Sequence, residues 1–304
     1  MTALSIDSIL AAANRLPKMP TVVMDLISAF ADDDLDNETL AQKLSRDQGL
    51  VARVLRVANS PFYGLPRQIG TVQDAITVLG FANVRTLVTA AAIISQFPRS
   101  NNAVFDLTAF WKHSIGVACC AKVLSVRAGH NPNTAFICGL LHDIGRVLLA
   151  CSYPEQYALI AEHRKIADCA WLDAERAVIG NDHAAIGSAL AARWNFPEQI
   201  QQAVADHHQP ENAAGSSLAG LTHVSDVICY ALDTGHDPAV FVPVLSAPAW
   251  AAMRLGWDDL NGVFAESEQM IEGISVLAGA ANDGGVDASK AARKPCVKTV
   301  AVAK

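Results

Sequence analysis

Apolar residues recur along most of this chain at the three- and four-residue spacing of an α-helix, and this periodicity limits the fold more than any other feature. Val51, Val54, Leu55 and Ala58, for example, share one helical face. Several later segments begin with a proline that suits the first turn of a helix: Pro132, Pro154 and Pro197. Hydrophobic residues make up 51% of the chain and aromatic residues only 6%, which favours closely packed helices over sheets. We therefore predict an all-α, multi-helix bundle.

Breaks in the periodicity give the expected helix limits. In the first half of the chain, Asp47 is placed to cap one helix, and Thr71–Asp74 resembles a capping box for the next. A turn must interrupt residues 59–64, because Pro61 disfavours helix before it and Gly64 frees the backbone. In the second half, the expected helices span residues 107–126, 132–151, 154–163, 168–179, 183–194, 197–208 and 218–232.

Composition divides the chain into four segments. Residues 1–98 are expected to form an N-terminal helical subdomain, which a polar link at 98–102 separates from the next part. Residues 103–236 are expected to form a second helical subdomain, which carries all nine histidines. A helical extension is expected at 237–280. Residues 281–304 are rich in Ala, Gly and Lys and are expected to be a mobile tail.

The charge balance argues against long nucleic acids as partners. Lys and Arg number 23 and Asp and Glu 30, so the net charge is −7, and no basic run occurs. Such a chain is a poor ligand for a phosphate backbone, and we expect no DNA partner.

The cysteines and the apolar runs favour a cytoplasmic protein. The seven cysteines are odd in number and form no CxxC motif, which is typical of small core residues in a reducing compartment. The N-terminal residues lack the basic start and apolar run of a secretory signal. The nearest candidate for a membrane span, Leu87–Ser95, is too short, so we expect no membrane segment.

Histidines and aspartates stand on or beside several of the expected helices, within otherwise apolar sequence. These residues are His113, His142, Asp143, His183, His207, His208 and Asp226. A charged aspartate among apolar neighbours costs several kcal/mol unless it is paired or bound to a cation. Imidazole and carboxylate are the ligands of divalent metals such as Fe, Mn, Zn, Ni and Co. A helical protein can assemble such a site only from several helices, so this spread predicts one shared metal site.

Each of these residues also has a simpler explanation. His142 and Asp143 could form an internal hydrogen bond that ties two helices together. His183 follows Asp182, which has the position of a helix cap. His207 or His208 could bind the carbonyl groups at the end of a helix.

Two basic residues stand close in sequence to the candidate ligands. Lys112 precedes His113, and Arg146 follows Asp143 by three residues. Either side chain could bind an anionic ligand, and Asp143, Lys112 and Arg146 are the candidates for catalytic residues. The alternative for each basic side chain is simple solvation at the surface.

The order of these histidines and aspartates resembles the H…HD…H…H…D pattern of the HD superfamily of metal-dependent phosphohydrolases. It resembles most closely one branch, the HDOD domain (HD-related output domain). Several further segments between about residues 16 and 235 are similar to that family, among them Leu16–Pro20, Val57–Gly64, Ala75–Gly80, Phe136–Gly145, Asp182–Gly187 and Trp194–Pro197. This resemblance implies a helical HDOD bundle whose metal ligands are the residues named above.

The resemblance also implies a function. HDOD proteins act as bacterial signalling or output modules, for which catalysis is not established. The related HD-GYP enzymes hydrolyse cyclic-di-GMP, but this chain has no Gly-Tyr-Pro motif after its His-Asp pair and carries Arg146 where those enzymes have lysine.

Three functions therefore remain open. The first is a regulatory module that works by contact with signalling proteins. The second is a metal-dependent phosphohydrolase, in which Asp143 and the imidazoles would hold metal while Lys112 or Arg146 binds phosphate. The third is binding of a small nucleotide without chemistry.

Overall fold

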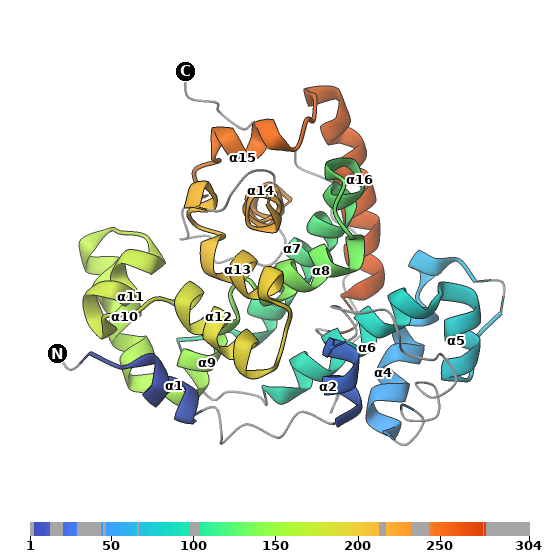
Figure 1. The fold of residues 1–304 in the computed structure, drawn as a ribbon, viewed down its shortest axis with the longest axis horizontal. Helices are drawn as coiled ribbons and strands as arrows, with labels where there is room; N and C mark the ends of the chain where they lie inside the picture. Colours follow the sequence, from blue (N-terminus) through green and yellow to red (C-terminus); the bar gives the residue numbers. More distant parts are fainter. Residues whose placement is uncertain are drawn as a thin grey trace.

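Every element in the described part of the computed structural model is a helix, as the periodicity predicts (Figure 1). The structure describes residues 3–12, 21–28, 44, 47–65, 67–97, 104–212, 217–232, 243–275 and 277. The expected link at 98–102, the motif Leu16–Pro20 and the expected tail at 281–304 lie outside these residues.

The N-terminal helices pack mainly around α6. Helices α2 (Thr21–Ser28), α4 (Gln48–Ala58) and α5 (Val72–Leu79) contact α6 (Phe81–Gln96), and η2 (Pro61–Tyr63) follows α4 in the chain. Asp47 caps α4 by accepting a hydrogen bond from the amide of Leu50 at 3.0 Å. Thr71 caps α5 in the same way through the amide of Asp74, also at 3.0 Å. Both predicted caps are confirmed.

The first helix belongs spatially to the second half of the chain. Helix α1 (Ile6–Ala12) packs on α12 (His183–Arg193) and α9 (Ile144–Ser152) rather than on the N-terminal helices. The amide of Leu4 donates to the carbonyl of Ile179 at 2.9 Å, and the Tyr153 hydroxyl donates to the carbonyl of Ser8 at 2.9 Å. The chain therefore starts on the histidine-bearing helices before it forms the N-terminal group.

The histidine-bearing part is a bundle in which α7 packs on α8 and α14, and α12 packs on α9 and α13. Its helices are α7 (Leu107–Ala128), α8 (Pro132–Leu141), α9 (Ile144–Ser152), α10 (Pro154–Ala167), α11 (Trp171–Ile179), α12 (His183–Arg193), α13 (Glu198–Asp206), η3 (Pro210–Asn212) and α14 (Leu218–Ala231). Glycines allow the closest approaches. A Cβ atom on Gly139 would lie 2.7 Å from the Ala118 backbone, and one on Gly145 would lie 2.1 Å from the His183 carbonyl oxygen.

The expected single helix over 132–151 is wrong in one respect. It divides into α8 and α9 at His142 and Asp143, where Asp143 has a non-helical ψ of 12°. The apolar pattern continues across this break, which is why the sequence did not indicate it.

Helices α8 and α9 also correct the expectation that Leu87–Ser95 is the nearest candidate for a membrane span. Pro132–Ser152 has the length and composition that could cross a membrane, which the sequence survey missed. However, 89% of its most apolar window is buried inside the fold, as in the core helices of a globular domain.

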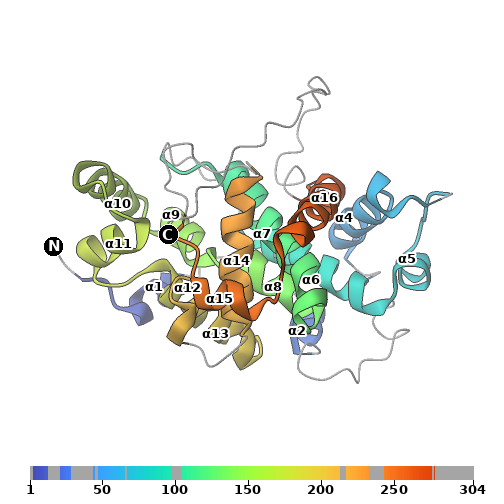
Figure 2. The ribbon, with the colours of Figure 1, turned by 90° about the horizontal axis from the view of Figure 1, so that it is seen from above.

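The C-terminal extension contributes two described helices, α15 (Ala247–Ala252) and α16 (Trp257–Ile274). Helix α16 runs along α7 and reaches η2, so it contacts both groups of helices (Figures 1 and 2). Arg127 of α7 pairs with Glu266 of α16 at 3.1 Å on the surface.

Candidate metal centre

The turn between α8 and α9 places His142 and Asp143 at the centre of the candidate site. The Nδ1 atom of His142 lies 2.8 Å from the carbonyl oxygen of Gly139, so its Nε2 atom faces the other way, toward Asp143 and Asp226. One oxygen of Asp143, Oδ2, accepts a hydrogen bond from Arg146 at 2.9 Å. The other, Oδ1, is directed at two further histidines.

His183 reaches Asp143 from the first residue of α12. Its Nε2 atom lies 3.1 Å from Asp143 Oδ1. On its other side, Nδ1 and the main-chain amide both bind one oxygen of Glu175, at 2.6 and 2.7 Å. Glu175 comes from α11 and is fully buried. Asp182 caps the helix through the amide of Ala185 at 2.9 Å, which confirms its predicted role.

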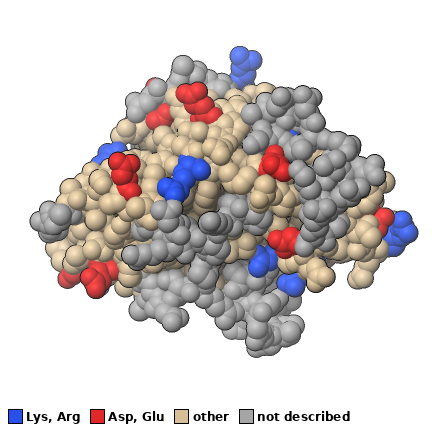
Figure 3. Space-filling model, turned by 60° about the horizontal axis from the view of Figure 1, so that its bottom comes forward, with Lys and Arg blue, Asp and Glu red and all other residues tan. Residues whose placement is uncertain are grey.

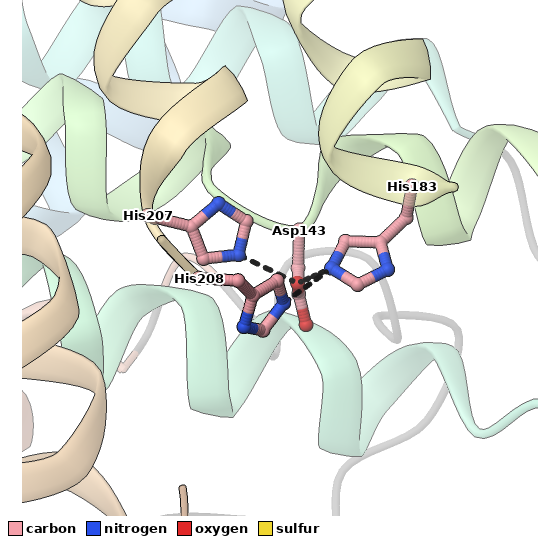
Figure 4. A group of neighbouring side chains, drawn as sticks. All are labelled: Asp143, His183, His207 and His208. Carbon is pink, nitrogen blue, oxygen red and sulfur yellow. Dashed lines mark hydrogen bonds and ion pairs between the residues drawn. The ribbon is translucent and has the colours of Figure 1, made fainter. Parts of the chain in front are cut away.

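His207 and His208 complete this group from the end of α13 (Figure 4). His207 Nδ1 lies 2.7 Å from the carbonyl oxygen of Val204, and its Nε2 atom lies 3.7 Å from Asp143 Oδ1. His208 Nε2 lies 2.8 Å from His183 Nε2. One possible donor atom from each of Asp143, His183, His207 and His208 lies within 4.8 Å of the others.

A second group adjoins the first through the His142–Asp143 pair. His113 of α7, His142 and Asp226 of α14 also bring one possible donor atom each within 4.8 Å of one another. Asp226 Oδ1 lies 3.1 Å from His113 Nε2 and 3.8 Å from His142 Nε2. His142 Nε2 is in turn 3.7 Å from Asp143 Oδ2. The structure thus brings together all seven residues that the sequence predicted as ligands.

The hydrogen bonds of the cluster leave lone pairs directed into its interior. A carbonyl oxygen can only accept, so Nδ1 of His142 and Nδ1 of His207 must each carry the proton, and both Nε2 atoms present a lone pair. These two Nε2 atoms are buried without a hydrogen-bond partner. Such groups cost about 1–3 kcal/mol each when left unsatisfied. A divalent cation fits this donor set of imidazole nitrogens and carboxylate oxygens.

The pKa values of the ligands follow from burial and from the opposing charges. Burial lowers the pKa of His142 to about 4 against the influence of Asp143 and Asp226, so this ring is neutral at pH 7 and can bind metal. Burial, together with His207 and His183, lowers the pKa of His208 well below its usual value.

The acidic partners make His183 the exception. Burial alone would lower its pKa, but Glu175 and Asp143 outweigh burial and raise the pKa to about 10. In the metal-free protein the proton on Nε2 therefore supplies a positive charge beside Asp143, which a bound cation would replace. Burial would also raise the pKa of Asp143, but His142, His183 and Arg146 hold it well below its usual value.

The two basic candidates lie in different environments. Arg146 is part of the cluster: it pairs with Asp143, and its guanidinium carbon lies 4.6 Å from the centre of the Trp171 ring. Lys112 is exposed on α7, although its neighbour His113 is buried in the site. The structure therefore brings Arg146, but not Lys112, to the candidate ligands.

Sequence reasoning missed Glu175. A signal was present, because Glu175 interrupts the buried face of α11, which it shares with Val178 and Ile179. An acidic residue on an apolar helical face is as informative as an acidic residue next to a histidine. Tyr230 was also missed; its ring centre lies 5.1 Å from that of His113.

Comparison with known proteins identifies the family. The model of the HDOD domain matches residues 16–210 of this chain. The chain belongs to the HDOD domain family. The match ends before Asp226, so α14 and the C-terminal helices of this HDOD protein extend past the matched stretch.

Two solved structures resemble this HDOD protein over most of its length. It shares 29% identity with the "Putative phosphohydrolase" of Shewanella amazonensis SB2B at a TM-score of 0.73, over 89% of this chain and 97% of that one. It shares 26% identity with an HDOD domain protein of unknown function from Geobacter sulfurreducens at a TM-score of 0.69, over 88% and 99% of the two chains.

A longer relative is similar over part of its length. An uncharacterized protein of Treponema pallidum is 26% identical over 249 residues, which make up 80% of this chain and 43% of that protein. The HDOD chain thus spans less than half the length of this curated relative.

Proposed function

We propose that this HDOD protein is a regulatory module of bacterial signalling that binds a divalent transition metal at the His/Asp cluster and acts through contact with partner proteins. One observation carries the metal site. The buried Nε2 atoms of His142 and His207 lack hydrogen-bond partners, and each lies 3.7 Å from an oxygen of Asp143. Imidazole and carboxylate ligands suit Fe, Mn, Zn, Ni or Co.

The residues of the cluster explain how metal binding would affect partner contact. The ligands come from α7, the turn between α8 and α9, the start of α12, the end of α13, and α14. With a cation bound, these residues hold the ends of separate helices in one arrangement. The outer faces of the same helices then present a defined surface to a partner.

Elemental analysis tests the metal site directly. The purified protein is incubated with Co²⁺ or Zn²⁺, desalted and analysed, beside His142→Ala, Asp143→Asn and the control His163→Asn, which changes a histidine on α10 outside the cluster. We expect stoichiometric metal in the wild type and the control, and a loss in the two site variants. A wild-type protein that takes up neither metal would overturn the proposal.

Partner binding and hydrolysis are then measured side by side. We expect binding to candidate signalling proteins to be stronger with metal than with a chelator, and to be lost in His142→Ala. If the affinity for the partner is the same with metal and with a chelator, partner binding does not depend on the metal.

A metal-dependent phosphohydrolase is the second candidate. The two adjoining groups of ligands and the guanidinium of Arg146 beside Asp143 favour it. In this case Asp143 and the imidazoles would hold the metal, which supplies Lewis-acid polarisation of a phosphoryl oxygen, and Arg146 would bind the substrate phosphate. Turnover of bis-p-nitrophenyl phosphate or a cyclic dinucleotide that Asp143→Asn abolishes would replace the first proposal with this one.

A further inference from the structure

His223 is a buried histidine next to the cluster that holds no ligand position. It lies on α14, three residues before Asp226, and is 4% exposed. Both of its ring nitrogens form hydrogen bonds with main-chain groups. Nδ1 lies 3.0 Å from the carbonyl oxygen of His207, and Nε2 lies 3.0 Å from the amide nitrogen of Ser246.

These two partners determine the tautomer of His223. The amide of Ser246 can only donate, so Nε2 must accept and carries no proton. The neutral ring therefore has its proton on Nδ1 and donates it to the His207 carbonyl. That carbonyl lies at the end of α13, where the helix itself provides no partner for it.

Ser246 also contacts the chain just after His208 through its side chain. Its hydroxyl donates to Glu211 at 2.9 Å and accepts from the amide of Ala249 at 3.3 Å, which caps α15. Glu211 lies in η3, three residues after His208. The segment that enters α15 thus holds the chain at two points, at the His207 carbonyl through His223 and directly at Glu211, which follows the His207–His208 pair.

We infer that His223 and Ser246 are positioning residues for the metal centre: they fix the backbone from which His207 and His208 reach Asp143 and His183. The inference rests on the proposed metal site and extends it to the C-terminal segment, whose described residues are not among the candidate ligands. A shift of the α13 end would move both imidazoles together, because they are neighbours in the chain. Losing the hydrogen bonds of His223 with His207 and Ser246 should therefore weaken metal binding and change the ligand geometry.

Paired substitutions isolate each hydrogen bond. His223→Asn keeps a donor near the position of Nδ1, whereas His223→Gln keeps a polar group only near Nε2. At Ser246, the φ angle of −66° is the one that proline needs, and the proline ring carbon would take the place of the amide hydrogen that points at His223. Ser246→Pro therefore removes the amide donor and pushes against the His223 ring, while Ser246→Ala keeps that donor and loses the hydroxyl. His163→Asn again serves as the control.

The probe is Co²⁺ alone, followed by calorimetry and by its visible absorption spectrum, with urea denaturation in chelator as the measure of folding. Changes around metal ligands cost about 10- to 100-fold in affinity, and we expect the lower end here because His223 acts on the backbone. His223→Gln and Ser246→Pro should each lose about tenfold and shift the spectrum. His223→Asn should retain most of the wild-type affinity, and Ser246→Ala should bind more tightly than Ser246→Pro.

The outcomes separate this inference from the proposed function. If the wild type binds Co²⁺ while His223→Gln and Ser246→Pro match its affinity and spectrum, the positioning role is overturned and the metal site stands. If the wild type binds no Co²⁺, both are overturned. If His223→Gln does not fold, the Ser246 pair decides: equal affinities and spectra for alanine and proline overturn the inference.

Discussion

Single side chains that bind no metal themselves control the orientation of the candidate ligands. Glu175 is the clearest case, because one buried oxygen receives two hydrogen bonds from His183, one from the ring and one from the backbone. Its charge also accounts for much of the raised pKa of His183. A carboxylate in this position fixes the ring and increases the basicity of its other nitrogen.

Glu175→Gln should therefore lower the affinity for Co²⁺ by about 10- to 100-fold. Glutamine keeps the volume and an acceptor oxygen but loses the charge that supports His183. Calorimetry on the variant and on the exposed control Glu272→Gln measures the effect. Equal affinity in all three proteins would show that Glu175 only fills space.

The contact between Glu175 and His183 predicts that the free energy of unfolding of the metal-free protein depends on pH. The pKa of His183 is about 10 in the folded state and near 6.5 when unfolded. Because folding raises the pKa, the stabilisation is complete below pH 6.5 and is lost as the pH rises toward 10. The difference in free energy of unfolding between wild type and Glu175→Gln, measured by urea denaturation in chelator, should shrink between pH 6.5 and 10. A difference that stays constant over this range contradicts the assignment.

Gly145 tests the close approach between α9 and α12. A Cβ atom there would lie 2.1 Å from the His183 carbonyl oxygen, so Gly145→Ala must push the two helices apart. We expect a destabilisation of about 1–3 kcal/mol or more, together with weaker Co²⁺ binding. In the control Gly70→Ala, nothing lies within 4 Å of the added methyl group. Urea denaturation should therefore show a much smaller change for the control than for Gly145→Ala.

At the scale of elements, five of the seven candidate ligands stand at the ends of helices, while His113 and Asp226 lie inside α7 and α14. His142 and Asp143 form the break between α8 and α9, His183 begins α12, and His207 ends α13. Side chains at such ends reach the space between neighbouring helices, where several chain segments can meet. The local bonds that define each helix end consequently affect the cluster.

Asp182→Ala should destabilise the protein by about 0.5–2 kcal/mol, because it removes the cap of α12. It should also weaken Co²⁺ binding, since His183 is the next residue. Asp182→Asn keeps a capping oxygen and loses mainly the ion pair with the half-exposed Arg176, which contributes little. Asp47→Ala removes the equivalent cap of α4 and should change stability but not metal affinity. Weakened metal binding in Asp47→Ala would mean that the effect is a general loss of folding.

At the scale of the whole molecule, the cluster joins helices that are distant in sequence. Helix α16 adds a second connection, because it contacts both α7 and η2. On the face shown in Figure 3, the described Lys, Arg, Asp and Glu side chains are scattered over a largely uncharged surface.

Metal binding should therefore stabilise the whole fold. At a free metal concentration of 100 times Kd, the expected gain is about 2.7 kcal/mol, and removal by a chelator should lower the melting temperature by several degrees. When the metal is removed, hydrogen exchange should show that the turn between α8 and α9, the start of α12 and the end of α13 lose protection together. Unchanged melting and exchange in the presence of Co²⁺ would contradict a cation shared by these elements.

The sequence by itself determined the helical class, the main helix limits and the caps at Asp47, Thr71 and Asp182. Helical periodicity and capping depend on residues within four positions of one another, so they can be read locally. The candidate ligands could also be identified, because a histidine or aspartate among apolar residues needs a partner wherever it is placed. The family pattern then indicated that these residues share one site.

Only the tertiary structure decided how those residues meet. The break at His142–Asp143 divides a stretch that the apolar pattern on both sides predicts to be one helix. Gly145, which has no side chain, allows α9 to lie against the start of α12 at His183. The partners of His223 lie 16 and 23 residues away in the chain, Glu175 meets His183 across the turn between α11 and α12, and the exposure of Lys112 depends on how other helices pack around α7. Such contacts are set by the packing of whole helices against one another, which no local pattern specifies.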